Sequence, residues 1–365
     1  DYPLIDGVVQ SEPSLLLEPA RTNLISYSED FSQSYWTKNG SSITSGFISP
    51  DGTSNASKLS EDNTNAIHRI YQTATVTASP NATISIYVKY NGRKFVLIRV
   101  ADSSVGRWYD IENGVLGTTY AGTPNDSSIE SVGNGWYRIS ISHTVSNQAR
   151  LELWVSDTES ISAYQGDTNK GVYIYGAQLE VGSYATSYIP TSGSAVTRAA
   201  ETAIGAGTSD DFNDSEGVLY IESAALANDG TNRQISISDG GTSQRVYFGF
   251  NANSNGFVLS SRDSSYLDGT ISDITNFNKY AFQYKSGNFK AFVNGFNYNL
   301  DVDGGLLPTG LNTLNFDDGS GGTDFYGKTK EIAYFKTALT DSELESLTSW
   351  DSFSDMATGQ LYSIK

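Results

Sequence analysis

Short runs in which apolar and polar residues alternate recur along most of the chain, and glycine, asparagine, aspartate or proline bounds each of them. Alternation with a period of two places every second side chain on one face, as in a half-buried β-strand. Thr83–Lys89, Trp136–Ser142 and Arg150–Val155 are examples. Asn91-Gly92 and Asn134-Gly135 stand at corners, where Asn-Gly favours tight hairpin turns. The pattern predicts strands joined by hairpins.

The alternation lapses between about Ser192 and Asp214 and resumes in a second set of runs, which includes Gly217–Glu222, Tyr280–Tyr284 and Lys330–Phe335. One helix is predicted from Asp341 to Leu347. Thr340 stands three residues before Glu343, and this pair forms a capping box at the start of a helix.

The length of 365 residues exceeds that of one ordinary hydrophobic core, so two domains are expected. We predict an all-β protein of two β-sandwich (jelly-roll) domains in tandem with one short C-terminal helix. The predicted parts are an N-terminal leader over residues 1–20, a first sandwich over 21–200, a linker over 201–213 and a second sandwich over 214–365.

Charge and residue usage narrow the classes of function. The formal charge of −18 disfavours nucleic acid and anionic membranes as partners, and no apolar run is long enough to span a bilayer. The absence of cysteine excludes thiol nucleophiles and cysteine-based zinc sites. A large acidic β protein without disulfides is typical of an extracellular protein that folded in a reducing cytoplasm, such as a phage structural protein. Nothing in the sequence forces a trimer, a common state of fibre proteins.

An ordered set of motifs spans roughly residues 15 to 200. It comprises Leu16-Leu17-Glu18-Pro19-Ala20-Arg21-Thr22-Asn23-Leu24, Tyr27–Phe31 followed by Trp36, Ser49–Thr53, Gly176–Glu180, and Ala185–Thr191. The set resembles the carbohydrate-binding-like (galactose-binding-like) jelly roll of phage tail and head-fibre proteins. The resemblance implies a sugar-binding module in a virion, and it implies that Trp36 and Trp136 pack in the core.

A second resemblance covers roughly residues 212 to 350. Lys290-Ala291-Phe292-Val293-Asn294-Gly295, and a final strand that leads into the helix after Thr340, are similar to concanavalin A-like (laminin G-type) lectin domains. Membership of that family implies binding more often than catalysis, although some relatives are glycanases or lyases.

The residues themselves argue against an enzyme. Glycanases need two carboxylates that flank one glycosidic bond, whereas Glu222 and Glu331 each stand alone on a predicted strand. The two histidines, His68 and His143, both fall in strand-like runs of the first domain, so a lyase-like or Ser-His-Asp site is not expected.

Aromatic faces and nearby polar groups suggest where a sugar would bind, because pyranose C–H groups stack on rings. Trp108 and Trp154 are the candidate platforms in the first domain, and Arg262, Asp263 and Tyr266 form a candidate groove in the second. In each case the alternative is an ordinary core or loop residue.

A structural Ca²⁺ ion is the one cofactor expected, since carboxylates are its preferred ligands. The first candidate is Glu29 with Glu180, which rests on the resemblance. The second is the acid-rich loop with Asp317 and Asp318, whose alternative is a solvated turn.

The predicted function is non-catalytic recognition of a cell-surface glycan or polysaccharide by a virion tail or fibre protein that also contacts other virion proteins. Two alternatives stay open. The chain is then either the carbohydrate-binding part of a polysaccharide-degrading enzyme whose catalytic domain precedes Asp1, or a purely structural decoration or assembly module.

Overall fold

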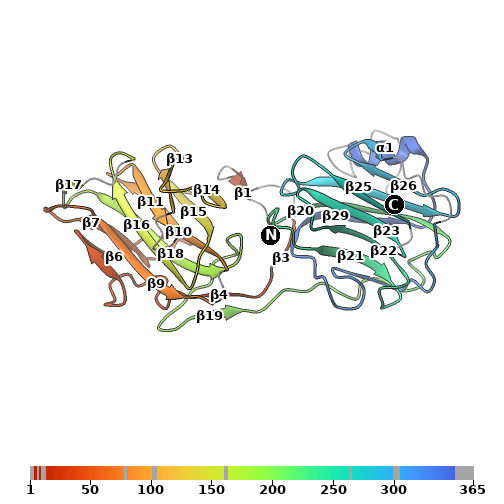
Figure 1. The fold of residues 1–365 in the computed structure, drawn as a ribbon, viewed down its shortest axis with the longest axis horizontal. Coiled ribbons are helices and arrows are strands. Elements are labelled where there is room, and N and C mark those ends of the chain that lie inside the picture. The colour runs from red at the N-terminus through yellow and green to blue at the C-terminus, as the bar shows by residue number, and fades with distance from the viewer. Residues whose placement is uncertain are drawn as a thin grey trace. The chain divides into compact units, whose positions relative to one another are not determined.

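The computed structural model describes residues 4–5, 8–9, 14–77, 80–100, 105–159, 163–262, 265–298 and 305–349. Regular structure in these residues is β-strand except for one helix, α1 (Asp341–Ser349) (Figure 1). The chain divides into two compact units, each with two facing sheets. The prediction of an all-β protein with two sandwiches and a short C-terminal helix is confirmed.

The first sandwich pairs two antiparallel sheets. One has the strand order β14 (Asp126–Gly133), β15 (Trp136–Thr144), β10 (Asn81–Asn91), β18 (Gly171–Val181), β7 (Ala56–Glu61), β6 (Ser41–Phe47). The other has the order β13 (Val115–Tyr120), β12 (Gly106–Asp110), β11 (Phe95–Arg99), β16 (Gln148–Ser156), β9 (Arg69–Thr75), β5 (Thr37–Asn39). Three small pairs accompany them: β1 (Leu4–Ile5) with β2 (Val8–Val9), β8 (Asn65–Ala66) with β17 (Tyr164–Gln165), and β4 (Arg21–Asn23) with β19 (Val196–Arg198).

Alternate residues of these strands build the core between the two sheets. Ile84 and Ile86 of β10 face Val96 and Ile98 of β11, and all four are fully buried. Trp36 lies in the same cluster, as the resemblance implied. The period-two pattern of the sequence therefore fixes which side of each strand faces inward.

The second sandwich is built in the same way. One sheet has the order β27 (Phe296–Tyr298), β26 (Lys290–Val293), β25 (Asn278–Lys285), β20 (Glu216–Ala225), β29 (Gly327–Phe335), β3 (Leu15–Leu17). The facing sheet has the order β24 (Ser265–Thr270), β23 (Gly256–Ser261), β22 (Arg245–Phe250), β21 (Arg233–Ser238), β28 (Thr313–Asn315). Phenylalanines such as Phe248, Phe257 and Phe282 fill the space between them.

Helix α1 covers the outer face of the β20 sheet. Thr340 and Glu343 form the predicted capping box: the Thr340 amide donates to Glu343 Oε2 (2.7 Å) and the Glu343 amide to Thr340 Oγ1 (3.3 Å). The helix lies against β25, β26 and β27, and its Leu344 and Leu347 share one buried cluster with Ala281 of β25 and Phe292 of β26. No helix in the described ranges lies on the outer face of the facing sheet, β21 to β24.

The predicted leader contains a strand of the second sandwich. Leu15, Leu16 and Leu17 of β3 pair with Thr329, Lys328 and Gly327 of β29. The described residues of 14–19 and 200–349 form one compact unit, and those of 20–199 belong to the other together with β1 and β2. The first sandwich is thus inserted between β3 and the rest of the second, whereas the sequence suggested a simple succession after a leader at 1–20.

The predicted linker over 201–213 is also bonded into the second sandwich. Ala206 and Leu314 of β28 exchange backbone hydrogen bonds, and the Phe316 amide donates to the carbonyl oxygen of Ala203 (2.9 Å). The segment therefore extends the β28 edge of the sheet. The sequence does not indicate this pairing, because the segment is made mostly of small and polar residues and its hydrogen bonds involve backbone groups.

Among the described residues, no helix is long and apolar enough to cross a membrane.

Candidate functional site

A row of four residues crosses the open outer face of the second sandwich. Gln234 of β21 pairs with Gly249 of β22, Gly249 with Val258 of β23, and Val258 with Asp268 of β24. Four adjacent strands span about 14 Å. Gly249, in the middle of the row, leaves no room for a side chain, because a Cβ there would lie 2.6 Å from the Arg233 carbonyl oxygen and 3.0 Å from Gln234 Cγ.

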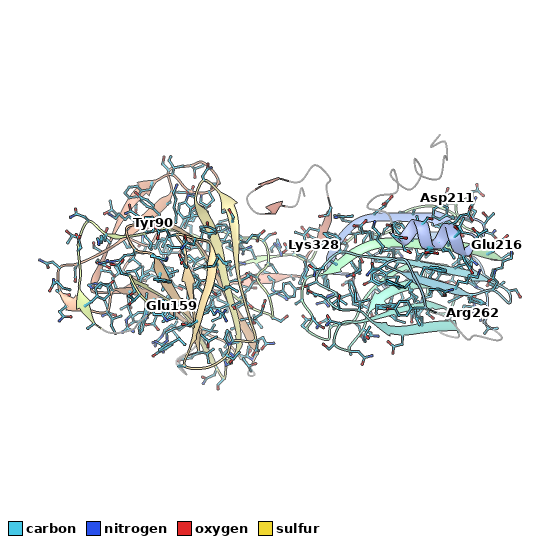
Figure 2. All side chains as sticks on the ribbon, turned by 90° about the horizontal axis from the view of Figure 1, so that it is seen from above. Tyr90, Glu159, Asp211, Glu216, Arg262 and Lys328 are labelled. Carbon is cyan, nitrogen blue, oxygen red and sulfur yellow. The ribbon has the colours of Figure 1, made fainter. Side chains whose placement is uncertain are left out.

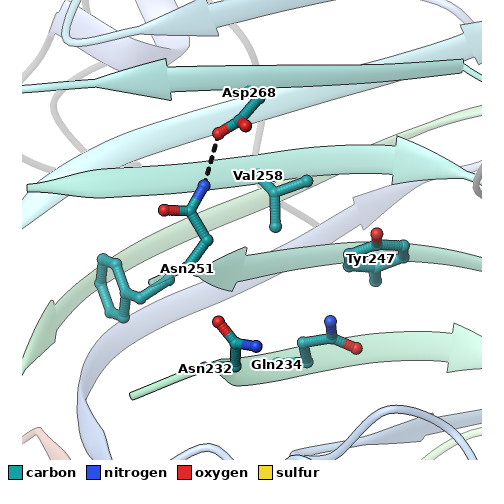
Figure 3. A pocket seen from close by; sticks show the side chains of 7 residues that line it. Asn232, Gln234, Tyr247, Asn251, Val258 and Asp268 are labelled. Carbon is teal, nitrogen blue, oxygen red and sulfur yellow. Dashed lines mark hydrogen bonds between the residues drawn. The ribbon is translucent and has the colours of Figure 1, made fainter. Parts of the chain in front are cut away.

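Three residues of this row line a groove of about 380 Å³: Val258 lies in its floor, and Gln234 and Asp268 lie on its two sides (Figure 3). Tyr247 and Asn251 flank Gly249 on β22 and just beyond its end, and Asn232 stands next to Gln234. A shallow cleft of this size, with an apolar floor and a few polar groups at its rim, is suited to a small polar ligand.

One polar wall of the groove consists of amides. Arg245 Nη1 donates to Gln234 Oε1 (2.9 Å), which fixes the orientation of the amide. Gln234 Nε2 then has no acceptor among the described residues, and the Asn232 side chain has no hydrogen bond there either. This wall offers donors to a ligand.

The other polar wall is the exposed carboxylate of Asp268. Asn251 Nδ2 donates to Asp268 Oδ1 (Figure 3), while Asn251 Oδ1 accepts from the Asn253 amide (3.0 Å). Asn251 therefore positions Asp268, and Asp268 Oδ2 has no donor in the described part of the chain. This wall offers an acceptor.

The next row of the same face contains two buried hydroxyls. Ser236 and Ser260 are the register partners of Tyr247 on either side, and each is 0% exposed. Neither hydroxyl has a hydrogen-bond partner among the described residues. Ser142 and Ser223 are buried hydroxyls of the same kind elsewhere in the protein, so this pair does not by itself mark a ligand site.

The three residues predicted for a groove in this sandwich have different positions. Arg262 follows β23 (Figure 2) and donates from Nη1 to the carbonyl oxygen of Leu307 (3.3 Å), outside the groove lining. Tyr266 lies on β24 as the register partner of Ser260, one row from Asp268, and its side chain is not described. Asp263 lies outside the described residues.

The two tryptophans predicted as platforms in the first sandwich are buried. Trp108 and Trp154 both pair with Leu97, and they are 2% and 5% exposed. Tyr120 packs beside Trp154, and the Arg69 and Arg99 guanidiniums lie over its ring, 5.5 and 5.4 Å from the centroid. Neither ring presents a face for stacking, so the platform prediction does not fit this structure.

The first predicted metal pair does not fit a Ca²⁺ ion. Glu180 is 0% exposed and its oxygens accept from Gln178 Nε2 (2.8 Å), the Thr186 amide (2.9 Å) and Thr186 Oγ1 (2.7 Å). Glu29 accepts from other donors, among them Asn55 Nδ2 (2.9 Å), and it lines a separate pocket of about 470 Å³. Both carboxylates are thus satisfied by different parts of the protein.

In the second predicted metal site, Asp317 and Asp318 cap turns of their own loop. Asp317 Oδ1 accepts from the Gly319 amide (2.6 Å), and Asp318 Oδ1 accepts from the Ser320 amide (2.9 Å). Burial, together with the charges of Asp318 and Asp324, raises the pKa of Asp317. No group of three or more histidine, cysteine or acidic side chains converges as a metal site within the described residues.

The structure brings together two acids that the sequence left apart. Glu222 of β20 and Glu331 of β29 are direct register partners. Lys330 Nζ lies 3.3 Å from Glu222 Oε1, and Glu222 is 6% exposed. The ammonium group balances the buried carboxylate, an ordinary arrangement for a cross-strand pair. The antiparallel register of β20 and β29, which is not visible in the sequence, creates this pair.

No protein-family model matches the chain, and no curated protein matches it. Weak similarity exists to solved structures. The CBM40 of the Ruminococcus gnavus IT-sialidase bound to α2,3-sialyllactose is 17% identical, covers 40% of this chain and 96% of its own, and has a TM-score of 0.33. Domains LG4-5 of the mouse laminin α1 chain are 7% identical with 92% coverage of both chains and a TM-score of 0.28. Trypanosoma rangeli sialidase is 8% identical, with 85% and 61% coverage and a TM-score of 0.32. At such values no function transfers to this chain.

Proposed function

We propose that this protein is a non-catalytic glycan-binding protein and that the groove on the β21–β24 face is its binding site. The observation that carries the proposal is the arrangement of free amide donors, a free carboxylate oxygen and an apolar floor along one row of that face. Sugar hydroxyls both donate and accept, while the C–H face of a pyranose is apolar. The groove matches both properties.

A wider role follows from the sequence. We propose that the glycan belongs to a cell surface and that the protein attaches a virion to it, as an extracellular tail or fibre component that contacts other virion proteins. The ordered motifs from Leu16 to Thr191, the charge of −18 and the absence of cysteine support this role. A binding part of a polysaccharide-degrading enzyme would use the same groove, and genes for tail proteins beside this one would favour the virion role.

The absence of catalysis is part of the proposal. The groove has one carboxylate, Asp268, whereas hydrolysis of a glycosidic bond uses two that face each other. Glu222 and Glu331 lie on the opposite sheet, where Glu222 forms an ion pair with Lys330. Incubation with the bound glycan should release no shorter or unsaturated product, and release of either would show that the protein is an enzyme.

A glycan array tests the binding proposal. The intact chain should bind one group of glycans, and the double variant Asn232→Ala/Gln234→Ala should lose that signal because it removes the donor wall. Gln148→Ala is the matched control, since Gln148 is an exposed glutamine on β16 of the first sandwich. Binding that survives in the double variant would place the site elsewhere, and no binding to any glycan would favour a purely structural module.

A further inference from the structure

We infer that the groove selects uncharged saccharides and excludes those that carry carboxylate, sulfate or phosphate groups. This inference rests on the proposed function and adds the ligand class. Its basis is the charge of the lining: of the described residues that form the groove, Asp268 alone is charged, and the others are amides, aromatic rings and Val258.

Neither of the two arginines nearest in sequence lines the groove. Arg245 Nη1 donates to Gln234 Oε1 and to the carbonyl oxygen of Asp318 (2.7 Å), and its guanidinium lies 4.2 Å from the centroid of the Tyr247 ring. Arg233 is 2% exposed and pairs with Asp229 (2.8 Å). The Arg233 guanidinium is thus buried in an ion pair of its own. The Arg245 guanidinium lies beside the lining residues Gln234 and Tyr247, but its Nη1 donates to protein acceptors, so an anionic sugar would lack a free bidentate partner.

Asp268 acts as both acceptor and filter. Because Asn251 engages Oδ1, Oδ2 points its lone pairs at hydroxyl donors without competition from the described residues. A hydrogen bond to a carboxylate is stronger than one to a neutral acceptor. The same carboxylate repels an anionic ligand, and the charge of −18 on the whole chain adds to the repulsion.

The polarity of the two walls also sets how a sugar lies. Hydroxyls that donate face Asp268 on β24, and hydroxyls or ring oxygens that accept face Gln234 and Asn232 on β21. Between the walls the sugar ring rests over Gly249 and Val258. A saccharide with neighbouring hydroxyls at one edge and an acceptor at the other satisfies both walls at once.

The inference is tested by comparing neutral with anionic saccharides as ligands and by removing the charge of Asp268. Affinities of the intact chain are measured at low and high NaCl for neutral gluco-, galacto- and manno-oligosaccharides, and for 3′-sialyllactose and oligogalacturonate. Asp268→Asn keeps the size of the side chain and removes its charge. Glu345→Gln makes the same charge change on α1, over the opposite outer face, and is the control.

We expect binding of a neutral saccharide, no binding of the anionic ones at low salt, and a loss of about tenfold in neutral affinity for Asp268→Asn but not for Glu345→Gln. Tighter binding of the anionic glycans by the intact chain, with loss in Gln234→Ala, would overturn the charge filter and leave the glycan site standing. Neutral binding that is equal in the intact chain and Asp268→Asn would also overturn it. No binding of any glycan would remove both proposals.

Discussion

The backbones of Glu18 and Glu201, 183 positions apart in the chain, lie side by side. The Glu18 amide donates to a Glu201 carboxylate oxygen (2.9 Å), and the Glu201 amide donates to the carbonyl oxygen of Glu18 (3.0 Å). These bonds join the two segments by which the chain leaves the second sandwich and returns to it. They explain how β3 remains in that sandwich although 180 residues of the other fold in between.

The first prediction concerns β3. Leu17 is 5% exposed and Leu15 is 43% exposed on the same strand, so only Leu17 adds to the core. Leu17→Ala should destabilise the second sandwich by about 2–3 kcal/mol, the cost of removing a buried leucine, while Leu15→Ala should change it by about 0.5 kcal/mol or less. Amide hydrogen exchange, followed separately in each sandwich, measures the stability change caused by each substitution. A loss confined to the first sandwich would contradict the place of β3.

The sequence predicted those features of the fold that depend on neighbouring residues. Alternation in Thr83–Lys89 or Gly217–Glu222 identifies strands and their inner faces, and Thr340 with Glu343 identifies the helix start. The pairing of Leu15–Leu17 with β29 was not predictable, because no local signal reports a partner more than 300 residues away.

The site was predicted less well, for physical reasons. The outer-face position of Trp154 is visible from alternation, but its cover of arginine and tyrosine side chains is not. The groove was missed because Asn232, Gln234 and Asn251 look like ordinary strand and turn residues. One signal was available: Gly249 interrupts the strand Arg245–Phe250, and a glycine within a strand often marks the close approach of a ligand.

The second prediction concerns a buried ion pair of the first sandwich. Glu61 is 0% exposed; although burial opposes its charge, hydrogen bonds from Arg93, Tyr164 and the Asp167 amide hold its pKa below the ordinary value of 4.5. Glu61→Gln should cost the first sandwich about 3 kcal/mol at pH 7, because Arg93 loses its main partner.

The pH dependence has a definite sign. A carboxyl with a lowered pKa adds stability above pH 4.5, and that stability is lost as pH falls through the pKa of the folded state. The difference in stability of the first sandwich between the intact chain and Glu61→Gln should therefore become smaller as the pH falls. Thermal unfolding at several pH values measures this difference. Glu112→Gln, at an acid whose side chain is 47% exposed, is the control. A stability difference that does not change with pH would contradict the stabilising role of the Glu61 charge.

The third prediction concerns Asp317, whose pKa is raised above its ordinary value of 3.8 by burial and by Asp318 and Asp324. A carboxyl of this kind costs stability at neutral pH, and the cost disappears below the ordinary pKa. Asp317→Asn retains an acceptor for the Gly319 amide, so it should raise the melting temperature of the second sandwich at pH 7 in a chelator and leave it unchanged at pH 3.

Calcium separates the two interpretations of this loop. If Asp317 and Asp318 bind Ca²⁺, millimolar Ca²⁺ should raise the melting temperature of the intact chain and not that of Asp317→Asn. Equal effects of Ca²⁺ on both proteins would identify the loop as a solvated turn. Destabilisation by Asp317→Asn in chelator would contradict the assigned cost of the buried charge.

The most direct test of the central claim is the calorimetric affinity of one array-selected oligosaccharide for three proteins: the intact chain, Gln234→Ala and Gln148→Ala. The groove predicts saturable binding that Gln234→Ala weakens about tenfold, with an unchanged melting temperature, and that Gln148→Ala leaves intact. Equal affinity in all three proteins would contradict it and remove the β21–β24 groove as the glycan site.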